Sequence, residues 1–257
     1  MLSLGLSLKL HTPSILASRF GYSQYSMAFD GTNDKLNNQT DVLLEKMAEV
    51  GFKDKGAISV WFQIHSSASG NGLIVNCQVD SNNRIFVQFK NSDGTIKCNY
   101  RGDGSTKSLS MSPDVGIKGD GKWHHVLFTW NTDNVASAWF DGNAQAAEST
   151  VSTHTFASGK DFDDDGSVVA MGEAETGLTD LYGYVDNVGL MFGNQVASDA
   201  LAIWNNYGSG LTGPLDLKGW DTVIEYWEFE EGSGATTRGA SGNVLEIAGA
   251  TFSTETP

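Results

Sequence analysis

The stretch WHHVLFTW at residues 123–130, followed by AWFDG at residues 138–142, decides the fold class of this chain. Apolar side chains occupy alternate positions in both segments, which is the period of a strand with one buried face. A polar turn, residues 131–134, separates them, and Asp-Gly ends the second segment with a turn signal. The two segments predict an antiparallel hairpin. Its adjacent histidines, His124 and His125, are expected to face opposite sides of the strand, one packed and one outward.

Short strand-like runs recur throughout the chain, whereas helical periodicity is scarce. Two short helices are predicted, one over residues 41–50 and one that begins after Ser198 and ends at Gly208. The 30 glycines against 4 prolines suit a fold with many tight turns, so the fold class is all-β, an antiparallel sandwich. The predicted strands lie near residues 57–64, 73–79, 84–90, 95–100, 107–111, 123–130, 135–140, 168–172, 182–192, 222–229 and 244–252.

Charge and hydropathy narrow the range of partners. The formal net charge is -15, and an acidic surface repels phosphate backbones, so nucleic acid is not an expected partner. No apolar run is long enough to cross a bilayer, so no membrane association is expected. The first ten residues lack the basic start and apolar block of a secretory leader.

The two cysteines, Cys77 and Cys98, lie in strands that a third strand at residues 84–90 separates. If the three strands form a meander, the cysteines are about 10 Å apart. A disulfide requires Cα atoms within about 7 Å of each other. The sequence therefore predicts two free thiols, as in a protein made in a reducing cytosol.

The chain divides into an N-terminal strand or arm with its connector, residues 1–24, and one domain, residues 25–257. Leucines alternate with Ser, Gly and Lys at the start, and such an apolar strand face must be covered. It is either the first strand of the sandwich or an arm that docks into a larger assembly. The leucines of this face are Leu2, Leu4, Leu6, Leu8 and Leu10.

Five segments together resemble the laminin-G-like, concanavalin A-like jelly-roll family. They are MAFDGTND (27–34), AISVWF (57–62), the hairpin at 123–142 with its WHHV and WFDG ends, GYVDNVGL (183–190) and SDALAIW (198–204). The resemblance covers roughly 170 residues in the family's order, and it implies a jelly-roll β-sandwich with one or two short helices. The family includes lectins, glycosidases, adhesins and virion parts, so the resemblance is more specific for fold than for function.

One arrangement departs from the family's pattern. The segment YWEFEEGSG (226–234) with ASGN (240–243) resembles a strand that commonly opens such domains, but here it closes the chain. Together with the leucine-rich start and the missing leader, this order is similar to that of tailed-phage virion proteins that carry this jelly roll.

Two calcium sites are expected. Asp161, Asp163 and Asp165, followed by Gly166, resemble the first half of an EF-hand loop, although Gly172 occupies the position of its bidentate glutamate. The alternative interpretation of this run is a solvated acidic turn.

The resemblance implies the second site, where the family's FDG loop meets its IDE strand. Its ligands would be Asp30, Asn33 or Asp34, and Asp186. The family's glutamate after that aspartate is Asn187 here, which removes a charge from the site. The alternative role for these aspartates is turn capping.

Sugar binding requires exposed aromatic rings beside polar groups. Trp220 and Tyr100 are the exposed candidates, because the tryptophans within strands are expected in the core. A glycosidase would require two carboxyl groups about 5 Å apart for retaining chemistry. The nearest cluster is Glu225, Glu228, Glu230 and Glu231, in which Glu228 and Glu230 share strand parity.

These observations predict a non-enzymatic virion structural protein of a phage, either a capsid decoration or a fibre or tail component, that displays a lectin-like jelly roll. The expected partners are other virion proteins or copies of itself, with surface glycans as further ligands, and calcium is the expected cofactor. The alternative is a calcium-dependent carbohydrate-binding adhesin at an extracellular or cell-surface location.

Overall fold

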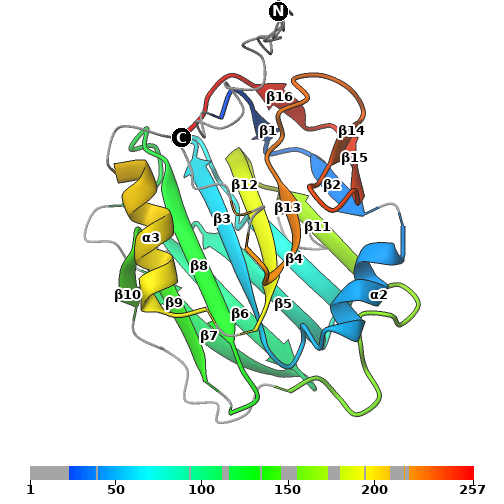
Figure 1. The fold of residues 1–257 in the computed structure, drawn as a ribbon. Coiled ribbons are helices and arrows are strands. Elements are labelled where there is room, and N and C mark those ends of the chain that lie inside the picture. The colour runs from blue at the N-terminus through cyan, green and yellow to red at the C-terminus, as the bar shows by residue number, and fades with distance from the viewer. Residues whose placement is uncertain are drawn as a thin grey trace, which may run out of the picture.

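The computed structural model describes residues 23–38, 40–92, 94–111, 116–133, 135–145, 155–172, 180–193, 195–208, 217 and 220–257. These residues form two antiparallel sheets packed face to face as a jelly-roll β-sandwich (Figure 1). The predicted all-β class is confirmed. The arm leucines Leu2, Leu4, Leu6, Leu8 and Leu10 lie outside the described residues, so the role of the arm stays a prediction.

The first sheet, sheet A, contains the hairpin that the opening stretch predicts, with Val126 opposite Phe140 and Trp130 opposite Ala136. Seven described strands of sheet A lie side by side in one continuous order, and an eighth, β13 (Val223–Trp227), pairs with β12 (Tyr182–Phe192) outside this order. The order is β10 (Asn143–Gln145), β9 (Ala136–Phe140), β8 (His124–Trp130), β3 (Gly56–Ile64), β12, β1 (Ser26–Asp30) and β16 (Thr251–Ser253).

The second sheet, sheet B, lies behind sheet A in Figure 1 and contains the predicted meander. Its order is β14 (Thr236–Arg238), β15 (Val244–Ala248), β2 (Lys35–Asn38), β11 (Val168–Gly172), β4 (Leu73–Asp80), β5 (Asn83–Lys90), β6 (Thr95–Gly102) and β7 (Ser105–Met111). Cys77 on β4 and Cys98 on β6 are fully buried free thiols with β5 between them, as the sequence predicted.

The alternation along β8 divides its side chains between two apolar clusters. Val126, Phe128 and Trp130 join the main core between the sheets, whereas Leu127 faces the other way into a second cluster on the outer face of sheet A. The Nε1–H of Trp130 donates a hydrogen bond to the carbonyl oxygen of Phe52 at 2.8 Å. The indole N–H of Trp130 is therefore satisfied within the core, whereas that of Trp227, which also belongs to the main core, has no hydrogen-bond partner among the described residues.

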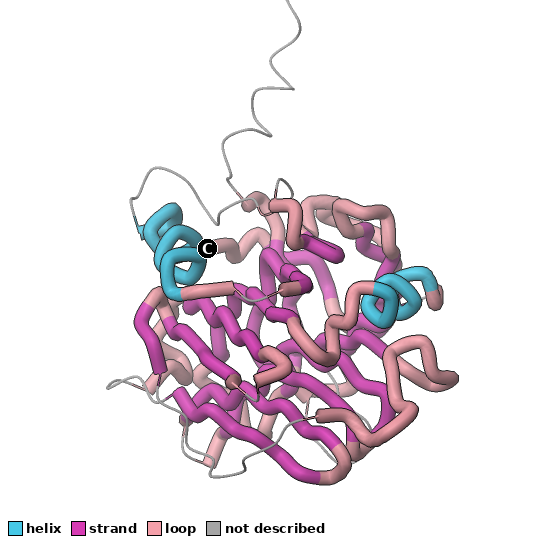
Figure 2. Tube along the Cα trace, turned by 60° about the horizontal axis from the view of Figure 1, so that its bottom comes forward, coloured by secondary structure: helices cyan, strands magenta, loops and turns pink. Residues whose placement is uncertain are grey.

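Two helices cover the sandwich at opposite sides (Figure 2). Helix α2 (Val42–Glu49) buries Leu43, Leu44 and Met47 against the main core. Helix α3 (Ala197–Gly208) lies on the outer face of sheet A, where Trp204 stacks on Trp61 with ring centroids 5.7 Å apart. Neither of these described helices has the length and apolar character needed to cross a membrane.

The strand predicted over residues 244–252 is wrong as one element. The structure has two strands there, β15 and β16, which belong to different sheets. Gly249 lies between them with a φ of 81°, a left-handed conformation that glycine adopts without strain. This break carries the chain from sheet B to sheet A beside the start of β1.

Candidate functional site

A cavity of about 230 Å³ opens where β1, β12 and β16 meet. Asp30 pairs with Tyr182 and Ala28 with Tyr184 across β1 and β12, while Thr251 of β16 lies opposite Ala28. This register brings three segments that are distant in sequence to one end of sheet A. The lining residues are Ala28, Phe29, Asp30, Asp34, His65, Tyr182, Gly183, Tyr184, Gly249 and Thr251.

One wall of the cavity is aromatic. The rings of His65 and Tyr182 stack with centroids 4.2 Å apart and an interplanar angle of 12°. The backbone N–H of His65 donates to the carbonyl oxygen of Tyr182. In the ring, Nδ1 of His65 accepts the backbone N–H of Ser67, so the ring hydrogen is on Nε2. Tyr184 shares a strand face with Tyr182. The wall therefore combines flat ring surface with the side-chain donors of His65 and the tyrosines.

A second wall, next to Tyr182, is acidic and comes from the turn after β1. Asp34 is 4 % exposed, and its Oδ2 accepts the backbone N–H of Asp30 at 2.6 Å. Oδ1 of Asp30 accepts the N–H of Thr32, and Oδ2 of Asp180 accepts the N–H of Asn33, which has a φ of 61°. The turn therefore holds the three carboxyl groups of Asp30, Asp34 and Asp180 close together.

Burial raises the pKa of Asp34 above its usual range. The hydrogen bond from the Asp30 N–H lowers the pKa, but the negative charges of Asp30 and Asp180 and a side-chain contact with Asp30 raise it further. The raised pKa of Asp34 therefore reflects its burial first and the negative charge of its neighbours second.

Asp186, which the family resemblance grouped with these residues, lies elsewhere. Asp30 pairs with Tyr182, four residues before Asp186, so the two aspartates are about 13 Å apart along β12. Calcium ligands lie about 2.3–2.6 Å from the ion, so one ion cannot contact both aspartates. Asp186 is fully buried and bonds to the Ser23 hydroxyl and the Asn187 N–H, and burial raises its pKa well above the usual range. The expected four-residue grouping is therefore wrong for Asp186, and calcium at Asp30, Asn33 and Asp34 stays a prediction.

The acidic run from Asp161 to Asp165 forms turns before β11. Asp161 makes an ion pair with Lys53 at 2.7 Å, and its other oxygen accepts the N–H of Phe162. Asp163 and Asp165 are exposed. Within the described ranges, no three His, Cys, Asp or Glu side chains are arranged to hold a metal ion. Calcium at Asp161, Asp163 and Asp165 stays a prediction.

The two aromatic candidates lie away from the cavity. Tyr100 is 1 % exposed, and its hydroxyl donates to the carbonyl oxygen of Lys53, so the expectation that it is exposed is wrong. Its ring packs beside Trp130, because alternation on β6 turns position 100 toward the core. Trp220 is half-buried and packs against the second apolar cluster.

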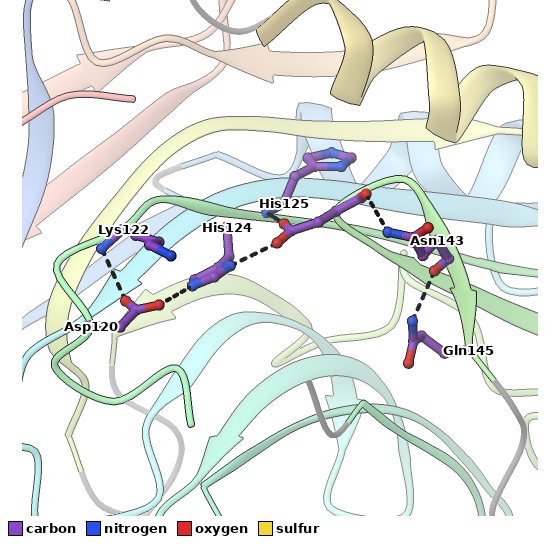
Figure 3. Close-up of polar contacts among 7 residues, drawn as sticks. Asp120, Lys122, His124, His125, Asn143 and Gln145 are labelled. Atoms are coloured by element: carbon purple, nitrogen blue, oxygen red, sulfur yellow. Dashed lines mark hydrogen bonds and ion pairs between the residues drawn. The ribbon is translucent and has the colours of Figure 1, made fainter. Parts of the chain in front are cut away.

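Both histidines of the opening stretch are buried, so the expectation that one points outward is wrong. His124 lies between two carboxylates, with Nδ1 2.8 Å from Asp141 Oδ2 and Nε2 3.0 Å from Asp120 Oδ2. Figure 3 shows the contact of His124 with Asp120. His125 faces the second cluster, where Ser59 contacts its Nε2 and Trp61 its ring. Burial lowers the pKa of His125 to about 3.

The pKa of His124 is shifted in the opposite direction from that of His125. Burial lowers its pKa, but the hydrogen bonds and charges of Asp141 and Asp120 outweigh burial and raise the pKa above the usual value. Asp141 also accepts the N–H of His125, and Asp120 accepts the N–H of Lys122. The charged ring of His124 therefore links the loop before β8 to the turn after β9 through its contacts with the two aspartates.

Sequence reasoning missed His65 and Tyr182. The pattern Tyr182-Gly183-Tyr184 was a usable signal, because it places two aromatic rings on the strand face opposite Val185. No such signal exists for His65, because its stacking on Tyr182 depends on how β3 and β12 pair.

Comparisons of this fold with solved structures give two informative matches. A proposed carbohydrate-binding protein from Bacteroides ovatus superposes with a TM-score of 0.60 at 12 % identity, over 90 % of this chain and 59 % of that one. Domains LG4-5 of the mouse laminin alpha1 chain superpose with a TM-score of 0.50 at 18 % identity, over 67 % of this chain and 43 % of that one. The chain thus spans about three fifths and two fifths of these structures, and the likeness is one of fold.

At the level of sequence, no curated protein matches the chain. A family model described as the concanavalin A-like lectin/glucanases superfamily, Laminin_G_3, matches residues 36–191, more than half of the chain. This range includes the hairpin of the opening stretch and all of β12 except its last residue, and thus Tyr182. The chain belongs to the concanavalin A-like lectin/glucanase superfamily.

Proposed function

We propose that this chain is a non-enzymatic glycan-binding module whose sugar site is the cavity beside Tyr182. The observation that carries the proposal is the stacked pair of His65 and Tyr182 in the cavity wall. A sugar ring has C–H-rich faces that pack on aromatic rings and a rim of hydroxyl groups that require hydrogen-bond partners. Both requirements meet within one small cavity at the end of sheet A.

The polar groups around the cavity suit sugar hydroxyls. Asp30 and Asp34 supply carboxylate acceptors, while Thr251 and the half-buried Tyr182 and Tyr184 carry hydroxyls that donate and accept. Sites for small ligands combine such apolar surface with a few placed polar groups. The fold likeness to a proposed carbohydrate-binding protein supports the proposal.

The proposal that the module is non-enzymatic rests on the structural hydrogen bonds that glutamates of residues 225–231 accept. Glu225 is fully buried, and its oxygens accept the backbone N–H groups of Tyr226, Ser241 and Asn243. Glu231 accepts the Thr237 hydroxyl and the N–H of Arg238. Strand β13 ends at Trp227, so the strand parity expected for Glu228 and Glu230 is wrong.

We expect Tyr182→Ala to weaken glycan binding at least tenfold, because alanine removes both the ring surface and the support for His65. Tyr182→Phe keeps the ring and is expected to retain most of the affinity. The measurement is a glycan array with wild type and both variants, followed by titration calorimetry on each glycan that binds.

The array also separates the other candidates for the site. Each protein is applied with added calcium and with chelator, and Trp220→Ala is included because the sequence favoured that ring. Binding that Tyr182→Ala leaves intact, or that only Trp220→Ala removes, would contradict a site in this cavity. Chelator-sensitive binding would support the calcium-dependent adhesin.

We further propose that the module belongs to a virion, as a capsid decoration or a fibre or tail component, docked through the arm of residues 1–24. The support is the alternation of five leucines over residues 2–10. Burying each leucine stabilises a docked arm by about 1.5–3 kcal/mol before the entropy of ordering is subtracted.

Deleting residues 1–12 is expected to give a folded protein that no longer assembles. Light scattering and circular dichroism of the full and shortened chains measure mass and fold. A shortened chain that forms the same oligomer, or is incorporated into particles as before, would contradict a docking arm.

A further inference from the structure

The cavity beside Tyr182 carries more negative charge than a neutral sugar requires. Asp30 and Asp34 line it, and Asp180 acts on Asp34 through its charge. In the described part of the chain, no ion pair involves any of these three carboxyl groups. Hydrogen bonds from backbone N–H groups hold the carboxyl groups in place without neutralising them.

Asp34 is the most informative of the three. Its side chain is almost fully buried, and Oδ2 is occupied by the N–H of Asp30. Oδ1 of Asp34 lies beside Gly249, and both residues belong to the cavity lining. Burial and the like charges of Asp30 and Asp180 both disfavour a charged carboxyl group at this position, so the wall is suited to a ligand that supplies a cationic donor.

The chemistry of the two walls identifies the class of donor. A protonated primary amine carries three N–H groups and one positive charge, which match several acceptor oxygens that are close together. The same cation is favoured near the face of an aromatic ring such as Tyr182. An acetylated amine loses the charge, and a sugar carboxylate would be repelled by Asp30 and Asp34.

We propose, on the basis of the sugar site proposed above, that this cavity binds an amino sugar with a free protonated amine. The ring packs on the Tyr182 and His65 side, and the ammonium group lies toward Asp30 and Asp34. The volume of about 230 Å³ is below the roughly 300–1,000 Å³ of sites for drug-sized ligands, so one sugar unit occupies it. The chain's net charge of -15 would also draw a cationic glycan toward the site.

The test compares two oligosaccharides of equal length, one of glucosamine and one of N-acetylglucosamine. They share the ring and differ in the charge of the nitrogen. Titration calorimetry at pH 6 is expected to give at least tenfold tighter binding for the free amine. The preference should fall as salt is raised, because screening weakens the ion pair.

Asp30→Asn is the diagnostic variant. Asp30 is exposed, and asparagine keeps an oxygen for the Thr32 N–H, so the turn should stay intact. The variant is expected to lose most of the preference for the free amine, so that its affinities for the two sugars become nearly equal. Glu45→Gln, an exposed carboxylate on α2, removes the same charge elsewhere and should leave the preference unchanged.

The outcomes separate this inference from the proposed function. Equal binding of both sugars that still depends on Tyr182 would overturn the amine preference and leave the sugar site standing. A preference that persists in Asp30→Asn, or that requires added calcium, would also overturn it. If no sugar of any charge binds in a Tyr182-dependent manner, the sugar site itself is wrong.

Discussion

Replacing Glu225 with alanine is expected to lower the free energy of unfolding by about 3 kcal/mol, because the buried N–H of Tyr226 loses its acceptor, at about 1–3 kcal/mol, and the part-buried hydrogen bonds from Ser241 and Asn243 are lost as well. Oε1 accepts the N–H groups of Tyr226 and Ser241, and Oε2 accepts the N–H and side-chain amide of Asn243. Gly239 packs against the same carboxyl group. The variant therefore loosens the turn between β14 and β15 as well as the end of sheet A.

Equilibrium urea unfolding of wild type and Glu225→Ala measures this effect. Glu45→Ala is the matched control, because it removes an exposed carboxylate and should change stability by no more than about 0.5 kcal/mol. An unchanged midpoint for Glu225→Ala would contradict the structural role. If wild type hydrolyses a glucan and a folded Glu225→Ala protein does not, the non-enzymatic proposal fails.

Replacing His124 with glutamine is expected to cost about 3 kcal/mol near pH 6, since each hydrogen bond to a charged group contributes about 1.5–3 kcal/mol. Asp120 and Asp141 hold the folded-state pKa of His124 above the value of about 6.5 found in unfolded chains. The folded state therefore binds the proton more tightly, and its stabilisation is complete below about pH 6. It fades as the pH rises through the folded-state pKa.

The stability difference between wild type and His124→Gln, measured by urea unfolding from pH 5.5 to pH 9, isolates this titration. It should be largest at the acidic end and shrink toward the alkaline end. His125 does not interfere, because burial lowers its pKa to about 3 and it stays neutral across this window. Curves that run parallel for the two proteins would mean that folding leaves the pKa of His124 unchanged, and a difference that shrinks toward acidic pH would mean that folding lowers it.

Local patterns in the sequence were sufficient to predict most strands. The hairpin of β8 and β9 and the strand β12 appear at the predicted positions, because alternation is a property of neighbouring residues. The break at Gly249 was not predicted, since alternation continues across it and only the left-handed φ of the glycine separates β15 from β16.

The candidate site was only partly predictable. Asp30 and Asp34 lie in one turn and are close in sequence, so the sequence was sufficient to predict that both belong to the same candidate site. Asp186 was misplaced because its distance from that turn depends on the register of β1 with β12, which a motif does not specify. His65 and Tyr182 were missed for the same reason, since only the arrangement of strands in sheet A stacks their rings.

The buried cysteines give this protein a practical property. Cys77 and Cys98 are the two thiols of the chain, both are fully enclosed, and burial raises the pKa of each. An exposed thiolate is the nucleophile that attacks an alkylating reagent, so the native protein, with both thiols buried, should be inert toward such reagents. A single cysteine introduced at half-exposed Val135 would then accept a fluorophore selectively. The slow rate at which the two native thiols react with the reagent would measure how often sheet B opens.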